Sequence, residues 1–131
     1  MSRIRIAAAL GALIVLGAGG ASVSATAGSS TTTIGVRNGV DEFSFFLSRT
    51  TVNPGPAVIQ YQNIGEDPHD LKVKRRGDAR IFAVGELEPD EVGHVSPRLK
   101  RDSRYELWCS LDGHREAGME AVLKVRDNRQ G

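Results

Sequence analysis

The chain has 131 residues, of which 25% are charged, 5% are aromatic and one is cysteine, and its formal net charge is +1. This length provides one hydrophobic core and leaves no room for two, and the balanced charge gives no indication of nucleic-acid binding. One cysteine excludes an intrachain disulfide and also a two-copper centre, which needs a second cysteine.

The first 27 residues have the features of a secretory signal peptide. Arg3 and Arg5 form a basic start, an apolar run follows over 6–19, and small residues at 23–27 form a cleavage site. The run is shorter than the roughly 20 residues of a spanning helix, although an uncleaved anchor is an alternative. Such a signal peptide would direct export to the periplasm, the extracellular space or the cell surface, and its cleavage would leave the protein without a membrane span.

Cleavage would leave 104 residues, enough for one domain. A flexible Ser/Thr-rich lead-in is expected over 28–33 and a single domain over 34–131. Short alternating stretches between turn residues predict an all-β Greek-key sandwich of about seven or eight strands. The segment 77–98 is the least regular and is compatible with a bulge, a short helix or a loop. The expected strands are 34–36, 43–47, 57–63, 69–74, 81–84, 93–95, 104–109 and 119–126.

Three of these strands carry a potential metal ligand on their apolar side, because alternate side chains of a strand share a face. The residues are His69, Cys109 and Met119. His114, in the loop between the last two strands, is expected at the rim, and His94 is expected to be a surface strand residue. The apolar residues in phase with the three are Leu71 and Val73 for His69, Tyr105 and Leu107 for Cys109, and Ala121, Leu123 and Val125 for Met119.

A thiolate, two imidazoles and a thioether form a ligand set that suits one copper ion cycling between two oxidation states. Four residues separate Cys109 from His114, and four separate His114 from Met119. This spacing lets the connection curl so that its three ligands converge, while His69 arrives from another strand. Gly113 and Gly118 permit the tight turns that this requires.

With this pattern the chain resembles the cupredoxins, the blue (type 1) copper proteins that include plastocyanin, azurin, auracyanin and rusticyanin. The resemblance covers about 34–127: a strand ending in Asn63 leads to His69, and the strand YELWC at 105–109 leads to the loop. The loop spacing is closer to auracyanin and rusticyanin than to plastocyanin. The resemblance implies copper ligation by His69, Cys109, His114 and an axial Met119, with His114 as the route of the electron.

Two residues depart from the usual cupredoxin pattern. Asp70 stands where many members have Asn, whose amide ties the strand to the hydroxyl residue after the cysteine, here Ser110. An ionised Asp70 would accept a hydrogen bond from Ser110, and its negative charge would lower the reduction potential. Asp112 stands where many members have Pro, and its charge could change partner docking at the rim.

The function expected from this resemblance is an exported, monomeric, non-enzymatic carrier of single electrons. Redox protein partners would dock transiently near His114, on an apolar rim formed by Leu111, Gly113, Ala117 and Gly118 with Arg115 and Glu116 beside it. The alternative function is a copper chaperone, scavenger or sensor without electron-transfer turnover.

Other interpretations of the same residues are a zinc site with one open position, a Cys-His nucleophile pair and ordinary core packing. Thioether is a poor zinc ligand, and an inward Cys109 would be inaccessible as a nucleophile. Basic residues also gather in two clusters, interpreted as solvated strand ends and turns, with a docking patch for an acidic partner as the alternative. The clusters are Lys72, Lys74, Arg75 and Arg76, and Arg98, Lys100, Arg101 and Arg104.

Overall fold

The computed structural model describes residues 20, 22, 24 and 28–127. The predicted signal peptide, 1–27, lies outside the described residues except at those first three positions, and so do residues 128–131 of the predicted domain. Within the described part, no helix is both long and apolar enough to cross a membrane.

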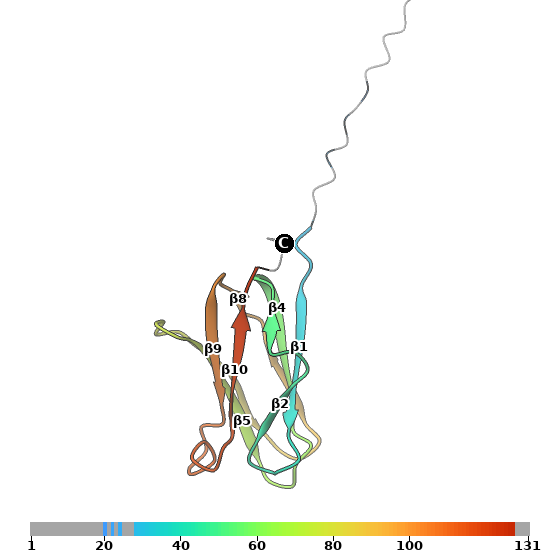
Figure 1. The fold of residues 1–131 in the computed structure, drawn as a ribbon. Helices are drawn as coiled ribbons and strands as arrows, with labels where there is room; N and C mark the ends of the chain where they lie inside the picture. The colour runs from blue at the N-terminus through green and yellow to red at the C-terminus, as the bar shows by residue number, and fades with distance from the viewer. Residues whose placement is uncertain (1–19, 21, 23, 25–27, 128–131) are drawn as a thin grey trace, which may run out of the picture.

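The described residues form two β-sheets that face each other, as Figure 1 shows. This confirms the predicted all-β sandwich. The first sheet has the order β2 (Phe45–Leu47), β1 (Thr32–Asn38), β4 (Gly55–Gln62) and β7 (Val92–Val95), with β8 (Arg98–Leu99) paired to β4. The second has the order β3 (Thr51–Val52), β10 (Glu120–Val125), β9 (Ser103–Trp108), β5 (His69–Arg75) and β6 (Ile81–Leu87).

Each of the eight expected strands is present, but the boundaries differ in places. β1 begins inside the predicted lead-in, because Thr32 and Thr33 pair with β4. The segment 77–98 is mainly strand, and β6 contains a bulge where its pairing with β5 shifts register. β3 and β8 have two residues each, too few for an alternating pattern to appear in the sequence.

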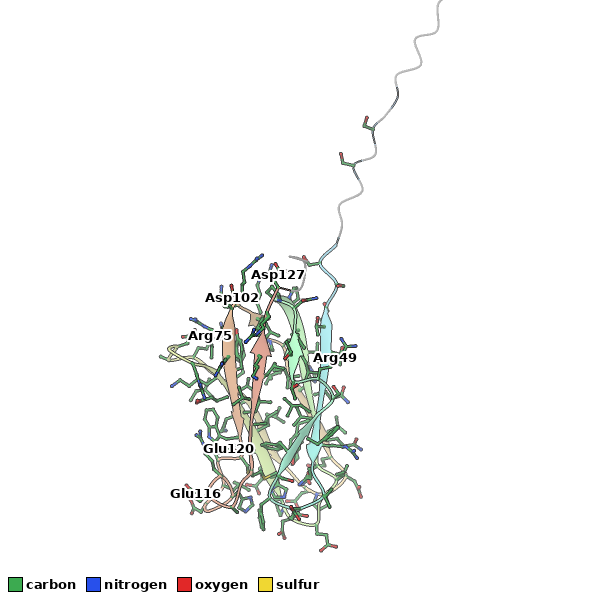
Figure 2. The ribbon with its side chains drawn as sticks, in the orientation of Figure 1. Arg49, Arg75, Asp102, Glu116, Glu120 and Asp127 are labelled. Carbon is green, nitrogen blue, oxygen red and sulfur yellow. The ribbon has the colours of Figure 1, made fainter. Side chains whose placement is uncertain are left out.

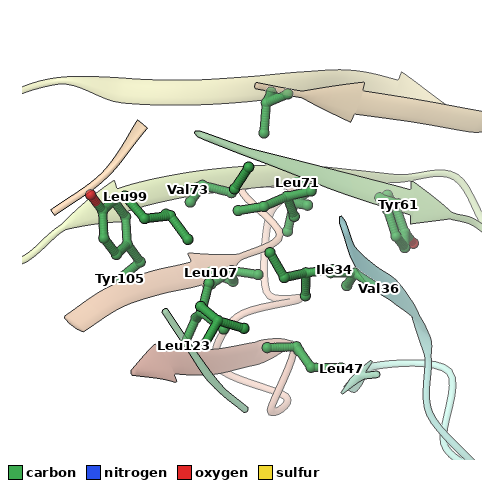
Figure 3. Close-up of a cluster of buried hydrophobic side chains, with 14 of the residues drawn as sticks. Ile34, Val36, Leu47, Tyr61, Leu71, Val73, Leu99, Tyr105, Leu107 and Leu123 are labelled. Carbon is green, nitrogen blue, oxygen red and sulfur yellow. The ribbon is translucent and has the colours of Figure 1, made fainter. Parts of the chain in front are cut away.

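The core lies between the sheets and consists of the inward residues of both. Ile34 and Ile59 from the first sheet and Leu71, Leu107 and Leu123 from the second are all 0% exposed. Figure 3 shows Ile34, Leu71, Leu107 and Leu123 gathered in this space. Such close-packed side chains leave little freedom for relative movement of the strands that carry them.

Four connections meet at one end of the sandwich, at the bottom of Figure 1, far from the end of β10. They are 39–44, 63–68, 88–91 and 109–119. Strand pairing places them together, since β1 and β4 run parallel, Gln62 of β4 pairs with Val92, and His69 of β5 pairs with Leu87. The predicted ligands belong to this end of the molecule.

Candidate metal centre

His69, Cys109 and His114 form one cluster, in which their potential ligand atoms all lie within 4.8 Å of one another. The Nδ1 atoms of His69 and His114 are 3.0 Å apart, and Cys109 Sγ is 3.5 Å from His114 Nδ1. His69 begins β5 and Cys109 directly follows β9, and both are 0% exposed. His114 is half-buried, so one edge of the cluster reaches the rim.

The loop 109–119 closes on itself through backbone hydrogen bonds. The N–H of Cys109 donates to the carbonyl of Met119 at 3.1 Å, and the N–H of Met119 donates to the carbonyl of His114 at 3.0 Å. Gly113 and Gly118 adopt φ angles of 79° and 116°, which glycine tolerates best. The Met119 side chain is 0% exposed, so the loop returns its last predicted ligand to the interior.

Asn63 organises the loop that leads into His69. Its side-chain amide donates to the carbonyls of Asp67 and Leu87 at 2.8 and 3.0 Å, and its Oδ1 accepts from the N–H of Gly65 at 3.0 Å. These bonds satisfy a side chain that is 0% exposed. Asn63, which directly follows β4, therefore has a structural role in placing His69.

Sequence reasoning missed the contribution of the connection 39–44. Glu42 Oε1 lies 2.7 Å from His69 Nε2. The ring of Phe43 packs edge-on against His114, with centroids 4.8 Å apart, and against His69 at 6.0 Å. Phe43 was expected in a strand, but β2 begins at Phe45. Neither residue belongs to a spacing motif, so the sequence contains no signal that would have identified them.

Asn38, at the end of β1, holds this connection in place. Its amide donates to the carbonyl of Glu42 at 3.1 Å, and its Oδ1 accepts from the Tyr61 hydroxyl at 3.0 Å and from the N–H of Ile64 at 3.2 Å. The side chain therefore joins 39–44 to the start of 63–68. Both loops that contact His69 are consequently anchored to the first sheet.

The electrostatics of the cluster depend on the carboxylates of Glu42 and Asp70 and on the thiol of Cys109. Burial raises the pKa of Glu42, but hydrogen bonds from His69 and from the N–H groups of Asp67 and Glu66 outweigh it and hold this pKa below its ordinary value. Burial raises the pKa of the Cys109 thiol. A metal that binds sulfur must therefore displace a proton from Cys109.

Asp70 makes the contact with Ser110 that was expected of it. Its Oδ1 accepts from the N–H of Ser110 at 2.6 Å, its Oδ2 accepts from the Ser110 hydroxyl, and Lys72 Nζ lies 3.3 Å from Oδ2. Asp70 faces away from the core side of β5, yet it is only 4% exposed because the loop covers it. Asp112 and His94 are exposed, the latter as expected.

The residues of the cluster fit a copper ion by the chemistry of their donor atoms. Two imidazole nitrogens and one sulfur face one another. The thioether residue Met119 is buried, and its backbone is hydrogen-bonded to the backbones of Cys109 and His114. Two imidazoles and a thiolate with a weak thioether ligand are typical of blue-copper sites. The complete burial of Cys109 argues against the nucleophile interpretation.

Comparison with solved structures shows the fold. The chain is similar to reduced auracyanin from the photosynthetic bacterium Roseiflexus castenholzii, with a TM-score of 0.62 and 17% identity over 75% of this chain and 98% of that one. It is similar to auracyanin A, a blue copper protein from Chloroflexus aurantiacus (TM-score 0.61, 16% identity, 74% and 100% covered). It is also similar to reduced rusticyanin (TM-score 0.56, 15% identity, 73% and 79% covered).

The sequence matches no protein-family model, and a search of curated proteins finds no significant match. The structural similarity at these identities establishes architecture. The chain has the cupredoxin fold, and the expected resemblance to auracyanin and rusticyanin is confirmed at that level.

Proposed function

We propose that the chain is an exported blue copper protein that carries single electrons, with His69, Cys109, His114 and Met119 as ligands. The observation that supports this proposal most directly is the buried His-Cys-His cluster at the loop end of a cupredoxin fold. Bound copper would supply a centre that alternates between Cu(I) and Cu(II). Export follows from the predicted signal peptide over 1–27, with the domain beginning after the lead-in.

The protein part of this function is to hold the ligands still. His69 begins β5, Cys109 directly follows the neighbouring strand β9 of the same sheet, and both side chains are completely buried. The loop that carries His114 and Met119 is closed by its own backbone bonds. A site with little freedom to rearrange suits electron transfer, because ligands then move little between the two oxidation states.

His114 would connect the site to a redox partner. It is half-buried in a loop whose Gly113, Ala117 and Gly118 are exposed, and the nearby connections add the exposed apolar residues Val40 and Ile64, which are 105% and 42% exposed. A small apolar rim of this kind supports brief contact rather than a permanent complex. We therefore propose transient partners and a monomeric carrier.

The optical spectrum after addition of Cu(II) tests the proposal. Wild-type protein is expected to turn intensely blue, and Cys109→Ala is expected to lose the colour because the thiolate is gone. Far-UV circular dichroism of metal-free Cys109→Ala, matched to wild type, controls for folding. Wild-type protein that binds no copper, or that binds it without intense visible absorption, would contradict the blue-copper assignment.

The role of Met119 is tested by Met119→Leu, which keeps an apolar side chain of similar volume in the core. The variant is expected to retain copper and its blue colour, with a higher reduction potential, because the axial ligand tunes the potential of such sites. Cyclic voltammetry measures the change. An unchanged potential would remove Met119 from the axial role.

Copper exchange separates the carrier from the chaperone alternative. A carrier is expected to keep copper in both oxidation states when it is dialysed against a Cu(I) chelator of moderate affinity, and to exchange electrons rapidly with its own oxidised form. Binding that favours Cu(I) over Cu(II), with ready surrender of Cu(I) to the chelator and no rapid electron exchange, would favour a chaperone or scavenger instead.

A further inference from the structure

Glu42 is fixed between the loop that precedes β5 and the His69 ring. Its Oε1 lies 2.7 Å from His69 Nε2 and accepts hydrogen bonds from the N–H groups of Glu66 and Asp67, each at 3.0 Å. The Glu42 side chain is 26% exposed, whereas that of His69 is 0% exposed. Three donors thus converge on one carboxylate oxygen, which holds the carboxylate at the buried ring.

This contact determines which nitrogen of His69 is available to a metal. An ionised carboxylate only accepts hydrogen bonds, so Nε2 must carry the proton, and a neutral imidazole then has an unprotonated Nδ1. Nδ1 is the atom that lies 3.0 Å from His114 Nδ1 within the cluster. Carboxylates that hold a ligating histidine in this way fix its tautomer and raise its basicity.

Gly65 leaves the space in which the carboxylate sits. A Cβ atom at this position would lie 2.2 Å from Glu42 Oε1 and 2.7 Å from both Cδ and Oε2. Gly65 is not among the glycines with positive φ, so its backbone does not itself require glycine. Because glycine has no Cβ atom, Glu42 can approach the backbone of 65–67 closely at this position.

We propose that Glu42 is a positioning residue of the copper site, which keeps Nδ1 of His69 free for the metal and favours Cu(II) over Cu(I) through its negative charge. The inference rests on the proposed function and deepens it. Removal of such a partner typically reduces metal affinity roughly 10- to 100-fold. Loss of a nearby negative charge weakens the binding of Cu(II) more than that of Cu(I), because Cu(II) carries the higher charge.

The first test uses metal-free protein, so it does not depend on copper binding. Nitrogen-15 NMR of the histidine rings is expected to show His69 protonated at Nε2 in the wild type. Glu42→Leu, which has no acceptor, is expected to lose this preference, and Glu42→Gln to retain it through the amide oxygen. Protonation of His69 at Nδ1 in the wild type would overturn the proposal, and so would an unchanged tautomer in a folded Glu42→Leu.

The second test compares reduction potentials and copper affinities of Glu42→Gln and Glu66→Gln. Both variants remove one negative charge from this end, but the exposed Glu66 side chain is not a hydrogen-bond partner of His69. Glu42→Gln is expected to lower the affinity for Cu(II) relative to Cu(I) about tenfold, which corresponds to about 59 mV in the potential. Equal shifts in the two variants would overturn the proposed effect of the Glu42 charge on the copper ion.

Gly65→Ala provides a variant that leaves the carboxylate itself intact. Because the new methyl group would occupy the place of the carboxylate, the potential is expected to rise as in Glu42→Gln. A wild-type potential in Gly65→Ala, with the NMR tautomer also unchanged, would count against the proposal. Wild-type protein that stays colourless with Cu(II) would instead contradict the proposed function, while the NMR result would still decide the part of Glu42.

Discussion

Asp70 introduces a second carboxylate close to the candidate ligands, on the opposite face of β5 from the core. Burial raises the pKa of Asp70, but hydrogen bonds from the Ser110 hydroxyl and N–H, together with Lys72, hold it below its ordinary value. The carboxylate is therefore charged at neutral pH. It joins the start of β5 to the residue after Cys109, as the amide does in many cupredoxins, but with an added negative charge.

Asp70→Asn is expected to change how stability depends on pH. A carboxyl group with a depressed folded pKa stabilises the fold above its unfolded pKa of about 3.9, and this contribution is lost as pH falls through the folded pKa. Hydrogen bonds to a charged acceptor exceed neutral ones by about 1 kcal/mol. Urea unfolding of metal-free protein should therefore show a wild-type advantage of about this size at pH 7 that disappears in acid.

The exposed Asp112 offers a matched control in the same loop region, and Asp112→Asn is expected to leave the unfolding free energy unchanged at both pH values. A wild-type advantage over Asp70→Asn that stays constant between neutral and acid pH would contradict the assigned electrostatic role. Equal stability at pH 7 would do so as well.

The loop 109–119 is shaped by glycines whose backbone angles other residues adopt with strain. Gly118 has a φ of 116°, and a Cβ there would lie 3.4 Å from the carbonyl oxygen of Phe43. Gly77, in the β5–β6 turn at the other end of the sandwich, has a φ of 78° and open space around it. Substitution at Gly77 therefore reports the cost of backbone strain alone, whereas substitution at Gly118 also reports its effect on the candidate metal site.

Gly118→Ala is expected to destabilise the protein by roughly 1–3 kcal/mol and to alter the visible spectrum of the copper form, because the strained segment carries Met119. Gly77→Ala is expected to cost about 1 kcal/mol and to leave the spectrum unchanged. Thermal unfolding and absorption spectroscopy measure both effects. Identical spectra for Gly118→Ala and wild type would show that the loop tolerates the change without moving its ligands.

The spacing of the strands and loop made part of this arrangement predictable. The inward phase of His69, Cys109 and Met119 followed from alternation within single strands, and burial agrees with it at each position. The alternation of inward and outward side chains involves consecutive residues of one strand, so it can be recognised in the sequence. Contacts between separate connections leave no such local pattern, and for this reason the approach of Glu42 and Phe43 to the histidines could not be predicted.

Charge is distributed unevenly along the long axis of the sandwich. The connections 39–44, 63–68, 88–91 and 109–119 contain nine Asp and Glu residues and one Arg, Arg115. At the other end, 76–80, 96–102 and 126–127 contain six Lys and Arg residues and three Asp residues. Figure 2 shows Glu116 and Glu120 toward the first end and Arg75, Asp102 and Asp127 toward the second. The candidate copper site is therefore at the acidic end, and one of the two basic clusters, around Lys100, lies at the opposite end.

This asymmetry predicts how small redox reagents will react with the reduced copper protein. The formal net charge of the whole chain is only +1, so net charge alone would give almost no dependence on salt. The electrostatic potential of the acidic end extends over a Debye length, which is about 30 Å at 0.01 M salt but only about 10 Å at 0.1 M.

Stopped-flow oxidation by a cationic cobalt(III) complex should therefore slow about tenfold as salt rises over this range, whereas oxidation by the anion ferricyanide should accelerate. Replacing Glu66 and Glu88 with Gln should flatten both dependences, and Asp102→Asn, at the basic end, should not. Parallel salt dependences for the two reagents would mean that electrons leave the protein away from the acidic end, and hence away from His114.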